Sequence, residues 1–226
     1  MSMWLVFASL FAFLSLLQLP SSQAKRGPAG MVFPTAGAPL SLEQVEERTR
    51  LLPDGTSETE VLMSKIYRDS AGRMRIEETV SGPSDKSIDV VQLVDPVACS
   101  IIVLTPEKIA ARIIAPKCGT NPFAVFFPSL EQTLPPGNWD RKTENLGIRK
   151  IEGIEFEGTR TTQTSVDQTS MIAVDERWDS KDLRLTGLAS GSGPTGRYTA
   201  RIQSVGRREP DPSLFLIPSD YRIQDF

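Results

Sequence analysis

The sequence predicts an all-β protein: a single strongly curved antiparallel sheet, or a half-open β-barrel, of about ten strands. Apolar or alternating runs recur at spacings of about 8–14 residues and are separated by turn residues, which is typical of β-sandwiches and β-barrels. No window holds a convincing apolar repeat of helical period, so only a few short helical turns are expected. Without crossover helices the strands cannot form a parallel sheet, and short turns favour antiparallel neighbours.

The predicted strands begin near residue 43, and the last of them ends at residue 205. Residues 69–72 (Asp-Ser-Ala-Gly) form a hairpin turn signal, and Asp211 followed by Pro212 favours a short helical turn. The glycine-rich residues 187–194 are interpreted as a flexible hairpin tip. The predicted strands are 43–52, 58–68, 73–80, 88–94, 98–104, 109–115, 144–151, 154–166, 171–179, 183–189 and 197–205.

Residues 1–24 predict a cleaved signal peptide. They contain no charged side chain, residues 4–19 are mostly apolar, and Ser22 and Ala24 occupy the small-residue positions that a signal peptidase requires. An uncleaved membrane anchor is the alternative, but the apolar stretch is shorter than the roughly 20 residues of a membrane span. Cleavage after Ala24 would place the protein in the periplasm or outside the cell and leave no stable membrane span.

The mature chain is expected to consist of a lead-in and one domain. Residues 25–41 are rich in Gly, Pro and Ala, which predicts a flexible or extended segment. Residues 42–226 are predicted to form a single β-rich domain. Residues 116–139 form a Pro- and Phe-rich insert in that domain.

Composition and motifs argue against catalysis, metal binding and nucleic-acid binding. The chain has no His, which excludes Ser-His-Asp and Cys-His catalysis and every His-containing metal site. A net charge of −3 gives no reason to expect nucleic acid as a partner. No phosphate-binding loop or nucleophile elbow is present. We therefore expect a protein that is not an enzyme, with no cofactor and no metal.

Two pairs of adjacent carboxylates, Glu46-Glu47 and Glu77-Glu78, lie in predicted strands. Adjacent residues of a strand point to opposite faces of the sheet, so the two members of a pair cannot converge on one substrate without help from another strand. We interpret all four carboxylates as solvated sheet surface.

The chain has two cysteines, Cys99 and Cys118, and export would place them where disulfides persist. If residues 105–108 form a hairpin turn, Cys99 lies opposite Ile114, and Cys118 lies beyond that register. A bond would require the chain to fold back after Pro116, because the two Cα atoms must lie within about 7 Å. The sequence leaves two alternatives: a Cys99–Cys118 disulfide, or a buried Cys99 with Cys118 in a loop.

The most apolar part of the mature chain is the hairpin at residues 98–115 together with the phenylalanines of the insert. A concave apolar sheet face must be filled by a covering element or by a ligand. The insert can serve as that cover, as a mobile lid over a ligand, or as an exposed partner-binding patch. The candidate ligand-binding residues are Phe123, Phe126, Phe127, Ile101, Val103 and Ile113.

Several motifs together resemble a group of exported bacterial proteins that has no assigned activity. The resemblance extends from about residue 43 to residue 221, nearly the whole mature chain. The motifs that carry it are residues 52–56 (LPDGT), 64–75 (SKIYRDSAGRMR), 95–98 (DPVA), 151–162 (IEGIEFEGTRTT), 175–178 (DERW), 209–215 (EPDPSLF) and 218–221 (PSDY).

The hairpin motif Tyr67-x-Asp69-x-x-Gly72-Arg73-x-Arg75, within its series of strands, is also similar to the lipoprotein-localisation-factor fold of LolA-, LolB- and RseB-like proteins. That fold is an open β-barrel with helices plugging its concave side, and it occurs in periplasmic lipoprotein carriers and envelope-stress sensors. This sequence lacks convincing plug helices and has the Pro- and Phe-rich insert where a cover is needed. The resemblance implies a fold and supplies no catalytic residues.

We therefore predict an exported, non-catalytic binding protein of the cell envelope, with an apolar or lipid-like group held in the concave face of a curved sheet. The alternative is a protein-interaction or envelope-sensing module with no small ligand. The expected partners are accordingly an apolar ligand or an envelope protein.

Overall fold

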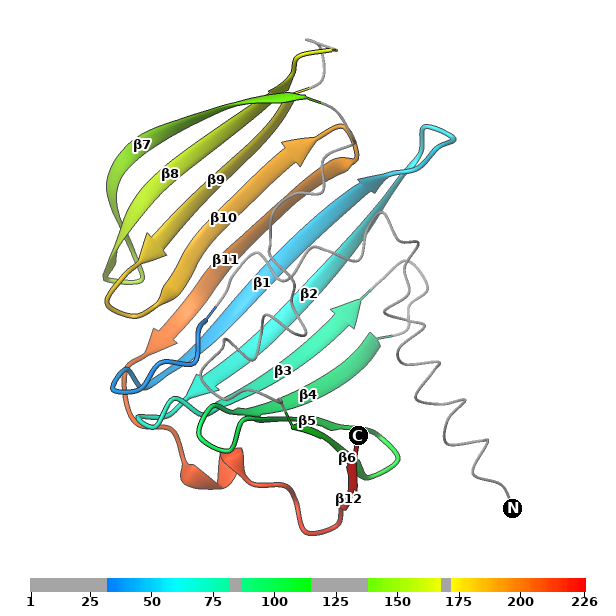
Figure 1. The fold of residues 1–226 in the computed structure, drawn as a ribbon, viewed down its shortest axis with the longest axis vertical. Helices are drawn as coiled ribbons and strands as arrows, with labels where there is room; N and C mark the ends of the chain where they lie inside the picture. Colours follow the sequence, from blue (N-terminus) through cyan, green and yellow to red (C-terminus); the bar gives the residue numbers. More distant parts are fainter. Residues whose placement is uncertain (1–31, 82–86, 115–137, 168–171) are drawn as a thin grey trace. The chain divides into compact units, whose positions relative to one another are not determined.

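Twelve strands form one sheet in the computed structural model, which describes residues 32–81, 87–114, 138–167 and 172–226 (Figure 1). These residues belong to one compact unit of the chain. The strands are β1 (Leu40–Leu51), β2 (Ser57–Arg68), β3 (Met74–Ser81), β4 (Ser87–Asp95), β5 (Ser100–Leu104), β6 (Ile109–Ile114), β7 (Trp139–Ile151), β8 (Ile154–Ser165), β9 (Ile172–Ser180), β10 (Leu185–Gly193), β11 (Gly196–Gly206) and β12 (Arg222–Asp225).

The sheet consists of two serial runs of strands joined in the middle. Its order is β12-β6-β5-β4-β3-β2-β1-β11-β10-β9-β8-β7, so the two runs meet where β1 pairs with β11. The named pairs are antiparallel except that β12 is parallel to β6. Strands β12 and β7 form the two edges, and the sheet is open. The predicted fold class is confirmed, with twelve strands instead of about ten; the short β12 was not predicted.

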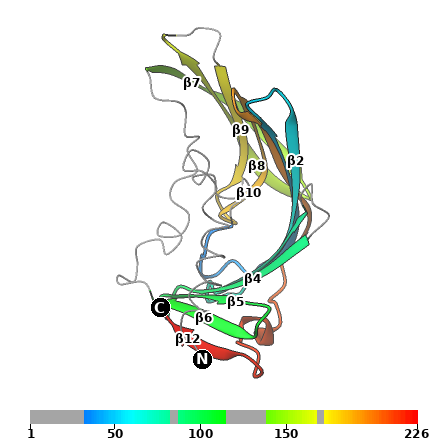
Figure 2. The same ribbon diagram turned by 90° about the vertical axis from the view of Figure 1, so that its right-hand side faces the viewer.

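The sheet is strongly curved, and the segment at residues 32–39 lies on its concave side (Figure 2). We call this segment the strap. Its Phe33 N–H donates to the Arg184 carbonyl oxygen at 3.1 Å, and its Gly37 N–H donates to that of Ser70 at 2.8 Å. The sequence predicts a flexible or extended lead-in at residues 25–41. Residues 32–39 of it are held against the sheet, because long-range backbone hydrogen bonds fix an otherwise irregular segment.

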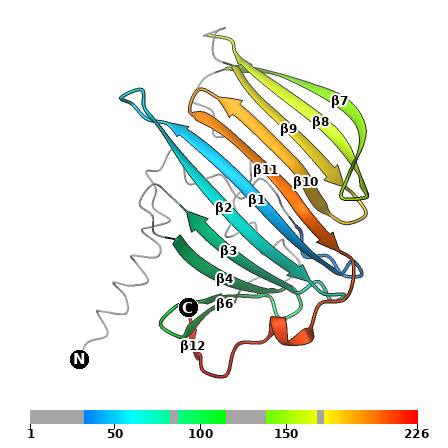
Figure 3. The same ribbon diagram turned by 180° about the vertical axis from the view of Figure 1, so that it is seen from behind.

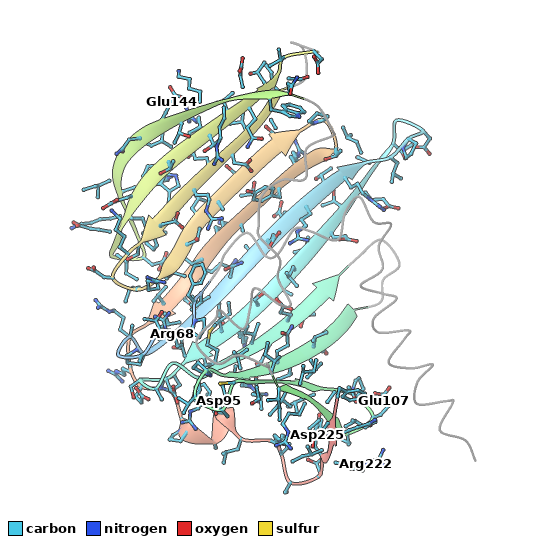
Figure 4. All side chains as sticks on the ribbon, in the orientation of Figure 1. Arg68, Asp95, Glu107, Glu144, Arg222 and Asp225 are labelled. Carbon is cyan, nitrogen blue, oxygen red and sulfur yellow. The ribbon has the colours of Figure 1, made fainter. Side chains whose placement is uncertain are left out.

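Arg68, labelled in Figure 4, fastens the strap to the sheet from the last position of β2. Its Nε donates to the Ala38 carbonyl oxygen and its Nη1 to that of Phe33, both at 2.7 Å. Its Nη2 donates to the Leu183 carbonyl oxygen at 2.8 Å. The Arg68 side chain therefore lies on the concave face of the sheet.

Residues 207–221, between β11 and β12, lie on the opposite, convex side of the sheet, and we call them the C-terminal segment (Figure 3). It includes the 3-10 helix η1 (Pro212–Phe215), where the Asp211 carboxylate accepts a hydrogen bond from the Ser213 N–H at 2.8 Å. The predicted helical turn is thus confirmed. Arg75 donates to the Leu214 carbonyl oxygen at 3.2 Å, and Ser70 donates to the Glu209 carboxylate. The motifs at residues 64–75 and 209–215 therefore contact each other.

The glycine-rich segment at residues 187–193 is strand, which corrects its interpretation as a hairpin tip. A Cβ atom on Gly187 would lie 2.5 Å from Cζ of Phe156, and one on Gly191 would lie 2.3 Å from Cε1 of Tyr198. These glycines leave room for aromatic rings from β8 and β11. Glycine in a strand is expected where another group approaches closely.

Candidate binding face

Strand register determines which side chains share the concave face with Arg68. Arg68 pairs with Leu40 of β1 and with Met74 of β3, and Met74 pairs with Val94 of β4. Val94 in turn pairs with Ile101 of β5. Because alternate residues of a strand point to the same face, the even-numbered residues of β1 to β4 and the odd-numbered residues of β5 and β6 lie on the concave face.

Strands β1 to β6 carry a row of buried apolar side chains on this face, which we call the apolar band. Each strand contributes at least one member, so the row runs across the strands from the middle of the sheet toward its β6 side. Its members are Leu40, Leu42, Ile66, Met74, Ile76, Val94, Ile101 and Ala111.

The predicted binding residues of the hairpin lie in or beside the apolar band. Ile101 pairs with Ile113, and Val103 pairs with Ala111, so Ile101, Val103 and Ile113 share the concave face. Ile101 is buried, whereas Val103 and Ile113 are half-buried. Phe123, Phe126 and Phe127 lie outside the described residues, and their role as cover or lid stays a prediction.

The convex face of the same strands has its own apolar cluster. Leu93, Leu104 and Ala110 are buried there, and Ile217 and Tyr221 of the C-terminal segment pack against them. Lys108 lies 4.9 Å from the Tyr221 ring centroid and forms an ion pair with Asp220. Strands β4 to β6 are therefore apolar on both faces, which agrees with the loss of strict alternation in the sequence.

A second group on the concave face, beside the apolar band, is polar. Gln44 of β1 lies opposite Ser64 of β2, Ser64 lies opposite Glu78 of β3, and Glu46 follows Gln44 on the same face of β1. Gln44 is 2% exposed, Glu46 1% and Ser64 4%. We call Gln44, Glu46, Ser64 and Glu78 the central polar cluster.

The central polar cluster corrects the interpretation of Glu46 and Glu78 as solvated surface. Burial raises the pKa of the Glu78 carboxyl, the charge of Glu46 raises it further, and Arg48 partly opposes this. Glu46 forms an ion pair with Arg48. The two carboxylates come from strands separated by β2, so they converge through register and not through sequence adjacency.

The signal for this cluster is present in β1, although it is weak. Leu40, Leu42, Gln44 and Glu46 continue one alternating row, and the first two are apolar. A strand that begins with two inward-facing leucines also directs the next alternate residues inward. The cluster was not predicted, because each pair of adjacent glutamates was considered without the residues of the neighbouring strands.

Polar groups at the β9–β11 side of the concave face bond to one another. The Tyr198 hydroxyl donates to Asp175 Oδ1 at 3.0 Å. Arg177 Nη2 donates to the Thr186 hydroxyl at 2.8 Å, and that hydroxyl donates to Asp179 at 2.5 Å. Gln44 differs, because its buried Oε1 has no hydrogen-bond partner.

The described ranges hold neither a candidate metal centre nor a membrane-spanning helix. Within them, no group of three or more His, Cys, Asp or Glu side chains is placed to hold a metal ion. No helix in the same ranges combines the length and the apolar character needed to cross a membrane. Residues 1–24, the predicted signal peptide, lie outside these ranges.

The environment of Cys99 is described, whereas Cys118 lies outside the described residues. Cys99 has a φ of 55° in the turn before β5. Ser100, and not Cys99, pairs with Ile114, because the hairpin turn closes with the Thr105 N–H donating to the Ile109 carbonyl oxygen. The Cys99–Cys118 disulfide stays a prediction.

The exposed edge strand β7 is protected against pairing with another chain. Its register shifts between Asn145 and Gly147, and Gly147 has a φ of 82°. Lys142 and Lys150 of this strand are exposed and form ion pairs with glutamates. A bulge and lysines are devices that keep an edge strand from adding a neighbour.

No family model and no curated protein matches this chain. Among solved structures, the MucA/MucB complex of Pseudomonas aeruginosa matches with a TM-score of 0.35 and 13% identity, covering 82% of this chain and 58% of that chain. The lipoprotein LppX of Mycobacterium tuberculosis matches at 0.35 and 11%, covering 72% and 84%. A LolA superfamily protein from Nitrosomonas europaea matches at 0.33 and 9%, covering 90% and 96%.

The chain spans less than two thirds of the MucB chain that it matches. At these TM-scores and identities, the similarity carries no inference about what this protein binds.

Proposed function

We propose that this chain is an exported, non-catalytic binding protein of the cell envelope that holds an apolar, lipid-like group against the apolar band. The observation that carries the proposal is the band itself, to which six neighbouring strands contribute buried apolar side chains. Export through a signal peptide cleaved after Ala24 is part of the proposal.

A sheet that is apolar on both faces needs an apolar partner on each of them. On the convex face of β4 to β6, Ile217 and Tyr221 supply that partner. On the concave face, the strap forms hydrogen bonds with Ser70, Arg184 and Arg68. None of these three residues belongs to β5, the strand that carries Ile101 and Val103. An acyl chain suits such a surface, because each buried methylene contributes about 0.8 kcal/mol.

A protein-interaction module without a small ligand is the competing function. One route to it is the addition of a partner strand at an open sheet edge. The bulge and the lysines of β7 oppose that route at one edge. The protected β7 edge therefore weakens the protein-interaction alternative, and the apolar band supports the ligand-binding proposal.

The first experiment is native mass spectrometry of the full-length gene product, purified from the envelope fraction without detergent. The proposal expects an added mass of lipid size that is lost on collisional activation. The same preparation reports signal cleavage, because a chain cut after Ala24 begins at Lys25. A bare chain that also takes up no fluorescent fatty alcohol, whose head carries no charge, would contradict the proposal.

A pair of matched variants then locates the binding surface. Val103→Asp places a carboxylate beside the apolar band, whereas Val45→Asp places one on the convex face; both valines are half-buried. Val103→Asp is expected to weaken fatty-alcohol binding at least about ten-fold, or about 1.4 kcal/mol. Val45→Asp should bind as wild type does. Equal effects of the two variants, with circular dichroism showing both folded, would place the binding surface elsewhere.

A further inference from the structure

The central polar cluster contains more hydrogen-bond acceptors than its neighbours satisfy. Gln44 is 2% exposed, and its Oε1 has no partner. A buried acceptor in that state destabilises the fold, because it has lost its hydrogen bonds to water and gained none in return. Register places Gln44 beside Ser64 and on the face that holds Glu78 and Glu46. The orphan oxygen therefore lies on the side of the sheet that holds two carboxylates.

Charge in the cluster is also incompletely balanced. Glu46 forms an ion pair with Arg48, which leaves the Glu78 carboxylate as the second negative charge. Burial and the charge of Glu46 raise the pKa of Glu78, so its ionised form is disfavoured in the fold. A cation beside Glu78 would remove that penalty.

We infer that the central polar cluster is a subsite for a primary ammonium group, so that the ligand is an amphiphile with an apolar tail and an amine head. This inference rests on the proposed function, because the apolar band must hold the tail. An ammonium group brings three N–H donors and one positive charge. These can be shared by Gln44 Oε1 and the carboxylates of Glu78 and Glu46.

The cluster and the band are adjacent along the strands, as such a ligand requires. Glu78 follows Ile76 by two residues on the same face of β3, a rise of roughly 7 Å. Ser64 precedes Ile66 in the same way on β2. A ligand whose head lies at Glu78 can therefore extend its tail over Ile76 and toward Val94. An anionic head would be repelled by Glu78 and Glu46, and a quaternary ammonium has no N–H to offer Gln44.

The inference is tested with four twelve-carbon probes that share a tail: dodecylamine, dodecyltrimethylammonium, dodecanol and dodecanoate. Their dissociation constants for the full chain are measured by calorimetry, below the micelle concentration of each charged probe and below the solubility limit of dodecanol. Dodecylamine is expected to bind at least about ten-fold more tightly than dodecanoate and more tightly than dodecyltrimethylammonium. Equal affinity for dodecylamine and dodecanoate would overturn the inference.

Substitutions of Glu78 and Gln44 test whether these two residues bind the ammonium group. Glu78→Gln should remove most of the preference for dodecylamine and leave dodecanol binding unchanged, and Gln44→Met should reduce the preference for dodecylamine over dodecyltrimethylammonium. Glu77→Gln is the matched control, because Glu77 lies on the opposite face and forms an ion pair with Arg75. A preference that survives Glu78→Gln would overturn the inference.

The outcomes separate the inference from the function on which it rests. If all four probes bind alike, the apolar band is occupied and only the ammonium subsite is wrong. If none of the four binds, the proposed function fails, and the inference fails with it.

Discussion

Arg68 and Leu183 lie 115 residues apart in the chain, and the Arg68 guanidinium donates a hydrogen bond to the Leu183 carbonyl oxygen at 2.8 Å. The same guanidinium bonds to the carbonyl oxygens of Phe33 and Ala38. Burial, and secondarily the charge of Arg184, lower the pKa of Arg68 to about 10. It therefore stays charged at neutral pH and keeps all of its donors. One side chain thus connects the strap, β2 and the turn before β10.

Replacing Arg68 should destabilise the fold strongly. Arg68→Ala leaves three carbonyl oxygens without this donor, and we expect a loss of about 3 kcal/mol or more in the free energy of unfolding. Arg68→Lys keeps the charge but not the forked geometry and should lose somewhat less. Urea denaturation measures both losses. The exposed Arg201 is the control, since Arg201→Ala should change stability by no more than about 0.5 kcal/mol. Wild-type stability of Arg68→Lys would contradict the importance of the fork.

Gly187→Ala should destabilise the sheet by about 1–3 kcal/mol, because the new methyl group would overlap the buried Phe156 ring. The double variant Gly187→Ala/Phe156→Leu tests this cause by removing the ring. Its loss should be smaller than the sum of the two single losses. Thermal unfolding of the four proteins completes the cycle, and strictly additive losses would show that the ring is not the obstacle.

Glu78→Gln should stabilise the protein at pH 7.5 and not at pH 4. Because the pKa of Glu78 is raised above its usual 4.5, the folded chain holds this proton more tightly than the unfolded chain does. The stability that this proton confers is fully present below pH 4.5 and is lost as the pH rises through the folded-state pKa. Urea midpoints of both proteins at the two pH values measure the difference. A gain of equal size at both pH values would rule out ionisation as the cause.

The predicted disulfide between Cys99 and Cys118 should protect both thiols. Unfolded chain treated with iodoacetamide should gain no alkyl group before reduction and two groups after it, as read by mass spectrometry. In the chain-entropy account, closing a loop of this size stabilises a fold by about 3 kcal/mol. Alkylation of both cysteines without a reductant would favour the alternative, in which the two thiols are separate.

Most strand positions could be read from the sequence, because alternation and turn residues act locally. The strand predicted at residues 58–68 is observed as Ser57–Arg68, and that at 109–115 as Ile109–Ile114. The placement of Ile101 in the apolar band and of Ile113 beside it also follows from alternation once the turn is known. The strand β12 was missed because it is short and pairs in parallel with β6, far from it in sequence.

The errors lie where distant strands meet. Residues 187–193 have the composition of a flexible tip, yet they form a strand. Gly187 and Gly191 are small because the rings of Phe156 and Tyr198 occupy the space that their side chains would need. Glutamates such as Glu46 and Glu78 are usually exposed to solvent, yet Glu46 is buried and the pKa of Glu78 is raised. Neither fact is encoded within a single strand.

The sequence by itself determined the fold class, the approximate positions of the first eleven strands along the chain and the apolar character of the β5–β6 hairpin. These properties depend on side-chain periodicity and turn chemistry over a few neighbouring residues. Only the tertiary structure decided that Gln44, Glu46, Ser64 and Glu78 share one face and that Arg68 fastens the strap. Those relationships depend on which strands become neighbours and in which register, and that is settled when the whole sheet buries its faces together.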